Sequence, residues 1–183
     1  MPRRTPWLSL SAATLLALLL LSACSSGGGK VNTSAAAPAT TPPSSMTSTT
    51  TVESKVLSDL KAEHDTYYRL AAAPNPDDPA IAQYMSGEQL QGFRSFLQGL
   101  IHDGEVARAG DVGRGNRVVS VQGATAVIDE CTTSDGKSAF YDAKTGRMVG
   151  PWGHGGQSKN ELTMLLQNGT WTLNHSVENG ACS

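Results

Sequence analysis

The chain has 183 residues, enough for one domain of ordinary size with short flanking segments. Its 14 Lys and Arg residues nearly balance its 16 Asp and Glu residues, which gives a net charge of -2. The basic residues are dispersed along the chain rather than gathered into a stripe, so we expect no nucleic-acid partner.

The first 23 residues have the three zones of a secretory signal peptide. Arg3 and Arg4 supply positive charge, Leu8 to Leu21 is an almost wholly apolar run, and two small residues follow. As a helix, this apolar run is shorter than the hydrocarbon core of a bilayer, which is roughly 30 Å thick. We therefore expect residues 1–23 to be a cleaved leader rather than a membrane span.

The sequence Leu21-Ser22-Ala23-Cys24 resembles the lipobox of bacterial lipoproteins. The resemblance implies that Cys24 is diacylated and becomes the new N-terminus, so that the membrane is one partner of the protein. Two acyl chains give stable anchoring, and we expect the protein at the outer face of the cytoplasmic membrane. The alternative is a plain secretory leader followed by a chance cysteine.

A tether is predicted over residues 24–51, because Ser25 to Thr51 is mostly Gly, Ser, Thr, Ala and Pro. Such a segment cannot bury enough apolar surface to offset the entropy of ordering, so it is expected to be disordered. The folded domain is expected over residues 52–183.

Three helices are predicted in the first half of this domain. The first begins at the capping-box sequence Thr50 to Glu53 and ends near Ala73, before two prolines. The second covers Pro79 to Met85, and the third runs from a capping box at Ser86 to Gly104. Two sets of side chains recur at helical spacing: Val56, Leu60, His64, Tyr67 and Ala71 in the first helix, and Leu90, Phe93, Leu97, Leu100 and Ile101 in the third.

Beyond Gly104 the pattern changes to strands. Val118 to Val121 and Ala124 to Cys131 are strand-like runs joined by a turn, and a shorter strand is predicted near Ser138 to Tyr141. The segment Asp111 to Asn116, which contains two glycines, is interpreted as a turn.

The last hairpin is predicted from Asn168-Gly169, which favours a two-residue turn. One face of the hairpin should be buried and the other wet. The cross-strand pairs expected on the buried face are Leu166 with Trp171, Met164 with Leu173, and Leu162 with His175.

Helices followed by a curved antiparallel sheet indicate an α+β domain. The element order resembles the NTF2-like (cone-shaped α+β, SnoaL-type) superfamily, as do Met85-Ser86-Gly87, the run Ala124 to Cys131 and Gly169-Thr170-Trp171. These runs also resemble exported actinobacterial lipoproteins with this fold. The resemblance implies a cavity between helices and sheet, over Val52 to Ser183. It does not choose a function, because the superfamily includes isomerases, cyclases, dehydratases and binding modules.

Cys131 and Cys182 remain once Cys24 is assigned to the lipid. A lone pair in an exported domain most often forms a disulfide, and the lipoproteins that these runs resemble pair a mid-sheet cysteine with one at the C-terminus. Two free thiols or a metal site would be the alternative. No His or Cys lies at ligand spacing near either cysteine, so we expect neither a metal nor a cofactor.

Candidate catalytic residues come from positions expected to face inward. His175 on an apolar strand face could act as a general base, or it could be a histidine at the core edge with one hydrogen bond. Either Asp129 or Glu130 faces inward, because adjacent strand residues point opposite ways. An inward carboxylate beside His64 or Tyr67 would resemble the acid–base set of ketosteroid-isomerase-like members, or it could be a rim carboxylate or a structural ion pair.

His64, Tyr67, Tyr68 and Trp171 are expected either as the wall of a ligand pocket or as packing against the sheet. Trp152 and His154 lie in a glycine-rich loop and could form a lid over the pocket or an anchor for a partner. The alternative is that Trp152 folds back on the domain.

The sequence contains no nucleophile-elbow or zinc-protease motif, and no free cysteine remains once the pair is oxidised. We therefore favour a non-enzymatic module that binds a small apolar ligand or an envelope protein, as a monomer or weak dimer. The alternative is an isomerase-type or cyclase-type enzyme that uses His175 with Glu130 or Asp129.

Overall fold

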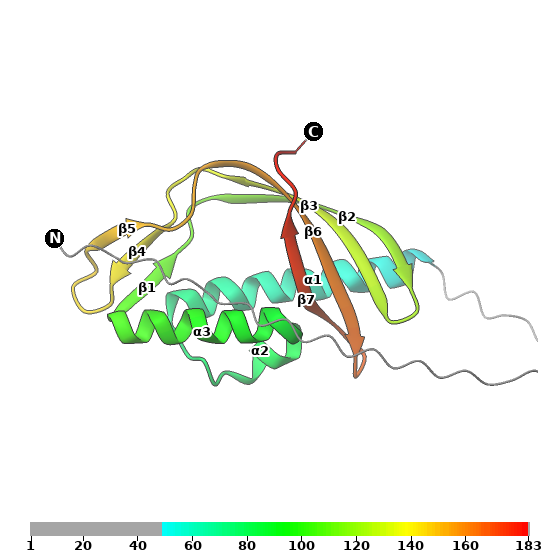
Figure 1. Ribbon diagram of the computed structural model, residues 1–183, viewed down its shortest axis with the longest axis horizontal. Helices are drawn as coiled ribbons and strands as arrows, with labels where there is room; N and C mark the ends of the chain where they lie inside the picture. Colours follow the sequence, from blue (N-terminus) through cyan, green and yellow to red (C-terminus); the bar gives the residue numbers. More distant parts are fainter. Residues whose placement is uncertain (1–48, 183) are drawn as a thin grey trace, which may run out of the picture. The chain divides into compact units, whose positions relative to one another are not determined.

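The computed structural model describes residues 49–182, which form three helices followed by seven strands (Figure 1). The helices are α1 (Thr49–Ala72), α2 (Pro79–Tyr84) and α3 (Gly87–Asp103). The strands are β1 (Glu105–Arg108), β2 (Val112–Gln122), β3 (Thr125–Ser134), β4 (Ala139–Asp142), β5 (Met148–Pro151), β6 (Gly156–Gln167) and β7 (Thr170–Glu178). The predicted α+β class is confirmed.

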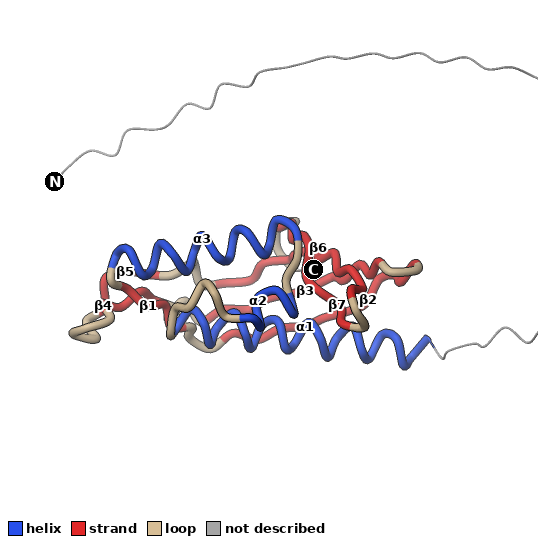
Figure 2. Tube along the Cα trace, turned by 90° about the horizontal axis from the view of Figure 1, so that it is seen from below, coloured by secondary structure: helices blue, strands red, loops and turns tan. Residues whose placement is uncertain are grey.

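The strands make two antiparallel sheets, one in the order β2-β3-β6-β7 and the other in the order β1-β4-β5. The sheets arch over the helices in Figure 1, and Figure 2 shows α2 between α1 and α3 when the molecule is seen from below. No helix within residues 49–182 is long and apolar enough to cross a membrane. The predicted leader, Cys24 and most of the tether lie outside the described residues.

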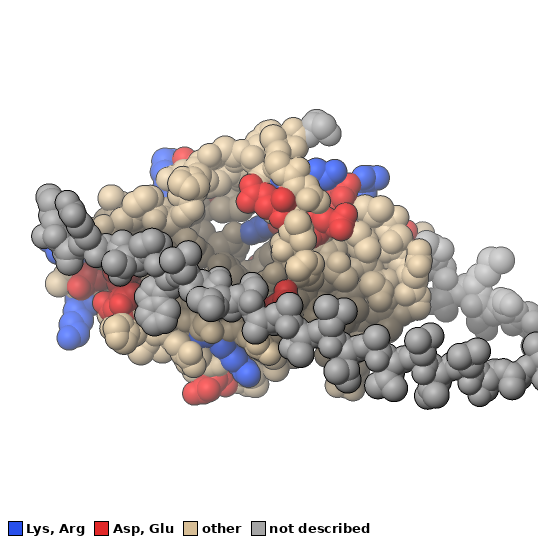
Figure 3. Space-filling view, in the orientation of Figure 1, with Lys and Arg blue, Asp and Glu red and all other residues tan. Residues whose placement is uncertain are grey.

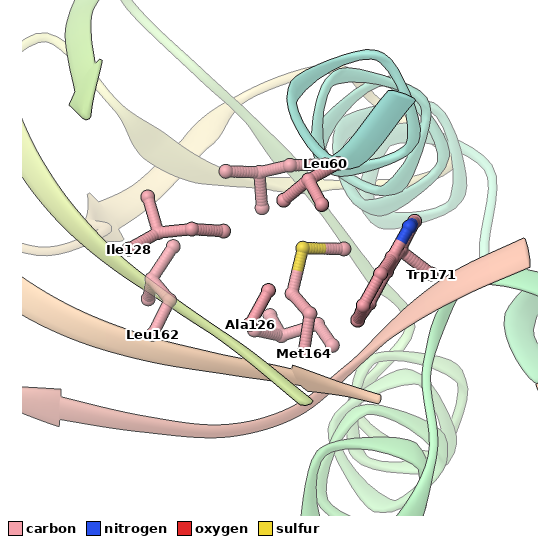
Figure 4. Close-up of a cluster of buried hydrophobic side chains, with 8 residues drawn as sticks. Leu60, Ala126, Ile128, Leu162, Met164 and Trp171 are labelled. Atoms are coloured by element: carbon pink, nitrogen blue, oxygen red, sulfur yellow. The ribbon is translucent and has the colours of Figure 1, made fainter. Parts of the chain in front are cut away.

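The apolar core has two parts. One lies between α1 and the four-stranded sheet and contains Val56, Leu60, Ala126, Ile128, Leu162, Met164, Trp171 and Leu173 (Figure 4). The other joins the three helices to β1 and contains Leu70, Ala71, Ile81, Met85, Phe93, Leu97, Leu100 and Ala107. α1 contributes side chains to both parts of the core and therefore connects them.

The helix ends agree with the sequence signals in part. Asp78 caps α2 by accepting a hydrogen bond from the Ala80 amide at 2.9 Å, and Gly104 ends α3 in the left-handed conformation with φ of 68°, as predicted. The capping box at Thr50 is wrong, because α1 already includes Thr49. Ser86 is the N-cap of α3, but its hydroxyl accepts from Thr172 Oγ1 at 2.9 Å instead of capping the helix.

The interpretation of Asp111 to Asn116 as a turn is wrong, since Val112 begins the long strand β2. Gly113 and Gly115 lie at its exposed positions, and Arg114 between them points inward. Glycine twice within four residues suggested a turn, but on alternate positions of one strand the glycines simply remove side chains from the outer face. The short strands β1 and β5 were not predicted.

The last hairpin forms at Asn168-Gly169, and the pairs Leu166–Trp171 and Met164–Leu173 are as predicted. A register shift between Thr163 and Met164 then changes the pairing, so Leu162 lies opposite Ser176 rather than His175. A β-bulge of this kind adds one residue to a strand and turns the following side chains to the other face. The predicted inward position of His175 is therefore wrong.

Candidate functional site

An open pocket of about 370 Å³ lies between the helices and the inner face of the four-stranded sheet, and we call it the central pocket. The face drawn in Figure 3 is hollowed at its centre, with a basic side chain visible inside and acidic side chains at the edge. The volume is in the range of small-molecule sites. The lining is mostly polar: Glu63, His64, Tyr67, Gln89, Arg114, Glu130, Asn160, Leu162, Leu173, Ser176 and Glu178.

α1 supplies one wall of the central pocket because its inward stripe changes character in mid-helix. Leu60 belongs to one part of the core and Leu70 to the other. Between them lie Glu63, His64 and Tyr67, which three- and four-residue spacing places on the same face. The pocket therefore lies where the two parts of the core fail to meet.

β3 supplies the opposite wall by the same kind of change. Ala126 and Ile128 are fully buried, and the next residue on that face, Glu130, is only 3% exposed. The sequence left Asp129 and Glu130 as alternatives, and the structure places Glu130 inward. Asp129 faces outward, where Arg117 donates a hydrogen bond to it at 2.6 Å.

Arg114 of β2 holds Glu130 in place. Its guanidinium donates to Glu130 Oε2 at 2.7 Å, to Thr132 Oγ1 at 3.3 Å and to the Tyr68 hydroxyl. Burial opposes its charge, but Glu130 and Tyr68 outweigh burial and raise the pKa of Arg114. The guanidinium is therefore a permanent cation, and three hydrogen bonds tie it to neighbouring side chains.

His64 lies between two buried carboxyl groups. Its Nε2 atom is 3.2 Å from Glu130 Oε1 and 3.4 Å from Glu63 Oε2. Neither oxygen has a hydrogen bond of good geometry to any group within residues 49–182. Buried polar atoms are nearly always paired, so two unpaired oxygens facing one nitrogen mark this cluster as unusual.

Burial controls the protonation of the cluster. It raises the pKa of Glu63 to about 8, an effect that Arg114 opposes and Glu130 reinforces. Burial, together with Arg114, lowers the pKa of His64 to about 3. At neutral pH the central pocket thus presents a protonated Glu63 and a neutral His64 beside the Arg114–Glu130 ion pair. A neutral carboxylic acid can donate a hydrogen bond, and it becomes an acceptor when it loses its proton.

Three aromatic rings pack against the ring of Tyr67. Its ring stacks on Phe93 at 4.6 Å, on Trp152 at 6.0 Å and on Phe96 at 6.1 Å between ring centroids. Burial, followed by Tyr68 and Glu63, raises the pKa of Tyr67 to about 12. Trp152 is therefore folded back on the domain, which was the alternative to a lid or a partner anchor. Through its stack on Tyr67, it holds one wall of the pocket in place.

The other candidate residues lie away from the central pocket. His175 is about half exposed, with Nδ1 3.3 Å from Glu88 at the start of α3. Trp171 is 2% exposed and belongs to the apolar core, not to the lining of this pocket. His154 is exposed in the loop before β6. Tyr68 does not line the pocket but touches it through Arg114.

The Cys131–Cys182 disulfide is present, with a Cα–Cα distance of 5.7 Å. It ties the C-terminal segment to β3, one residue after Glu130. No group of three or more His, Cys, Asp or Glu side chains within residues 49–182 has an arrangement that could hold a metal ion.

Two members of the cluster were not singled out from the sequence. Arg114 was assigned to a turn, and Glu63 sits beside the helical stripe that pointed to His64. Glu63 had a signal in the spacing, because it is three residues after Leu60 on the same helix. Arg114 had none, because the strand-like run predicted from the sequence begins only at Val118.

No protein-family model and no curated protein matches the sequence of this chain. Among solved structures, the intermembrane space region of the chloroplast protein ARC6 is similar at a TM-score of 0.51 and 11% identity, covering 73% of this chain and 98% of that one. This likeness shows the fold alone.

Two further structures are similar at lower TM-scores. The Kfla4162 protein from Kribbella flavida has a TM-score of 0.48 and 10% identity, covering 74% of this chain and 94% of that one. An NTF-2 like protein of unknown function from Silicibacter pomeroyi has a TM-score of 0.37 and 18% identity, covering 70% of this chain and 98% of that one. The helices-first architecture that the NTF2-like resemblance implies is what residues 49–182 adopt.

Proposed function

We propose that this protein is a membrane-anchored binding module that takes up a small polar molecule in the central pocket, without turning it over. The observation that carries the proposal is the pair of buried, unpaired oxygens, Glu63 Oε2 and Glu130 Oε1, in the wall of an open pocket. A buried acceptor without a partner is costly, and a ligand that donates hydrogen bonds would remove that cost.

The lining favours a polar ligand over the apolar one expected from the sequence. Of the side chains around the pocket, Leu162 and Leu173 are aliphatic, whereas most of the others carry a charge, an amide or a hydroxyl. Sites of this kind gain specificity from a few fixed polar groups, and the Arg114–Glu130 ion pair supplies such fixed groups here.

The test is whether small molecules bind in this pocket. The chain, purified gently from its host, should carry a small-molecule adduct in native mass spectrometry, which also reads the oligomeric state. Ser176→Phe, which fills the pocket, should abolish the adduct, whereas Val177→Phe, at the neighbouring exposed position, should retain it. A clean apo mass, with no thermal shift from a panel of polar metabolites, would move the proposal to an envelope-protein partner.

The membrane anchor is part of the proposal and rests on the lipobox-like sequence ending at Cys24. A lipid anchor and a tether would let the domain capture its ligand near the membrane while rotating freely. Cys24→Ser should move the protein from the membrane fraction to the soluble fraction. Unchanged membrane association of that variant would contradict lipid anchoring.

An isomerase-type enzyme is the second candidate, and the neutral Glu63 beside His64 favours it. An acid with a raised pKa and a nearby base are the tools of proton transfer. Glu63, His64 and Glu130 would carry such a reaction, because His175 lies outside the pocket. Deuterium uptake from heavy water into the carbon skeleton of the bound molecule would favour the enzyme, whereas binding without uptake supports the module.

A further inference from the structure

Two buried oxygens in the central pocket, Glu63 Oε2 and Glu130 Oε1, have no hydrogen bond of good geometry to any of the described residues. Both are acceptors once Glu63 has lost its proton, and this restricts the chemistry of the ligand. Glu63 Oε2 and Glu130 Oε1 both lie within 3.4 Å of His64 Nε2, so the two oxygens and the ring nitrogen form one cluster. Both residues are only 3% exposed. A group that satisfies them must bring two donors into one small volume.

Arg114 does not supply a site for an anion. It is the one Lys or Arg side chain in the pocket lining among the described residues, and its guanidinium already donates to Glu130, Thr132 and Tyr68. Its charge is balanced by Glu130 at 2.7 Å. An anionic ligand would therefore meet a guanidinium that is already paired with Glu130, and two further carboxyl groups, Glu63 and Glu178.

We infer that the central pocket binds a ligand through a primary ammonium group, held between the carboxylates of Glu63 and Glu130. An ammonium has three donors and no acceptor. The two carboxylate oxygens accept two of its hydrogen bonds, and the neutral His64 ring accepts the third in the tautomer that leaves Nε2 unprotonated. The inference names the ligand class of the site and so rests on the proposed binding function.

Two other features of the lining suit a cation. Glu178 of β7 adds a carboxylate to the pocket lining, which raises the local concentration of cations near the entrance. Tyr67, whose ring is fixed by its stack on Phe93, adds an aromatic side chain to the lining, and aromatic rings attract ammonium groups.

Binding of an ammonium is coupled to the ionisation of Glu63. The titratable or charged groups that face Glu63 are His64 and Tyr67 on α1, Arg114 on β2, Glu130 on β3 and Glu178 on β7, while α3 presents the neutral Gln89. Since burial raises the pKa of Glu63 to about 8, the apo protein holds a proton there at neutral pH. The ligand's charge replaces that proton, so binding releases it.

The test uses three probes with the same alkyl chain and different charge: butylammonium, butyrate and butanol. Binding to the full chain is measured by ligand-observed NMR and calorimetry at several pH values. Butylammonium should bind best, and its affinity should rise about fiftyfold from pH 6 to pH 8, in proportion to the ionised fraction of Glu63. Calorimetry in two buffers of different ionisation enthalpy should show release of nearly one proton at pH 6.

Glu63→Gln keeps the shape of the neutral acid but cannot ionise. It should weaken butylammonium binding at pH 8 by at least tenfold and remove the pH dependence. Glu161→Gln is the matched control, because Glu161 is exposed on β6 and does not line the pocket. The control should behave as the natural protein does, so a general loss of charge cannot account for the effect.

Each other outcome overturns the inference. Equal binding of butanol or tighter binding of butyrate would exclude an ammonium site while leaving the pocket as a binding site. Butylammonium affinity that is the same at pH 6 and pH 8 would show that Glu63 is not its partner. If none of the three probes binds and the gently purified chain carries no adduct, the proposed function fails as well.

Discussion

The stability of the domain should fall as the pH rises above neutrality, because Glu63 is buried as a neutral acid. Burial raises the pKa of Glu63 to about 8, whereas the pKa of a Glu in an unfolded chain is about 4.3. The folded state therefore binds this proton more tightly than the unfolded state does. The stabilisation is fully present below about pH 4 and is lost as the pH rises through 8.

His64 changes the stability of the domain with pH in the opposite direction, so the measurement is made at a pH where its effect is small. Burial lowers the pKa of His64 to about 3, so the unfolded chain binds that proton more tightly and stability rises with pH until about 6.5. At pH 6.5 half of the unfolded chains still hold this proton, so between pH 6.5 and 8.5 His64 offsets about 0.4 kcal/mol of the loss in stability. Between pH 6.5 and 8.5 the loss due to Glu63 alone is about 2 kcal/mol.

Urea unfolding of the purified chain at intervals across this window measures the effect, with the fluorescence of the buried Trp171 as the signal. Glu63→Gln should remove the fall in stability with pH and leave the variant more stable than the natural protein at pH 8.5. Glu161→Gln should retain the slope. A flat profile in the natural protein, or the same slope in Glu63→Gln, would refute the assignment of a buried neutral acid.

Three further changes test other parts of the structure. Arg114→Met leaves the buried Glu130 carboxylate unpaired and should lower the free energy of unfolding in urea by about 3 kcal/mol. Arg117→Met, in the exposed pair on the same strand, should lower it by less than about 1 kcal/mol, and equal losses would contradict the ion-pair assignment. Cys182→Ser opens a loop of 51 residues and should lower the free energy of unfolding by about 4 kcal/mol, which comparison with the reduced natural protein checks. Trp152→Ala removes the stack on Tyr67 and should cost about 2 kcal/mol with weaker ligand binding, whereas a lid would change binding without changing stability.

The helices and the final hairpin were predictable because local signals specify them. Asp78 before Pro79, Gly104 after α3 and Asn168-Gly169 are short-range patterns whose geometry needs no tertiary contact. The bulge beyond Met164 was not predictable in this way. Nothing near Thr163 signals an extra residue, and one such residue moves His175 from the inner face to the outer face.

The candidate site was predictable only on α1 and β3. Spacing pointed to His64 and Tyr67, and it showed that either Asp129 or Glu130 faces inward. Which of the two carboxylates does so depends on which face of β3 meets α1. The role of Arg114 depends on a contact between side chains 16 residues apart, which sequence spacing does not encode. The raised pKa of Glu63 depends on burial between two parts of the core, and burial of that kind is a property of the folded chain.

The gap between the two apolar clusters also bears on how stable this domain could become. Aliphatic residues in place of Glu63 and Glu130, with a matching change at Arg114, would join the clusters into one continuous interior, and exchanges of buried ionic groups for aliphatic ones often leave a fold more stable. A domain that keeps ionisable groups there instead has given up easily gained stability, and proteins commonly do so where activity depends on the groups concerned.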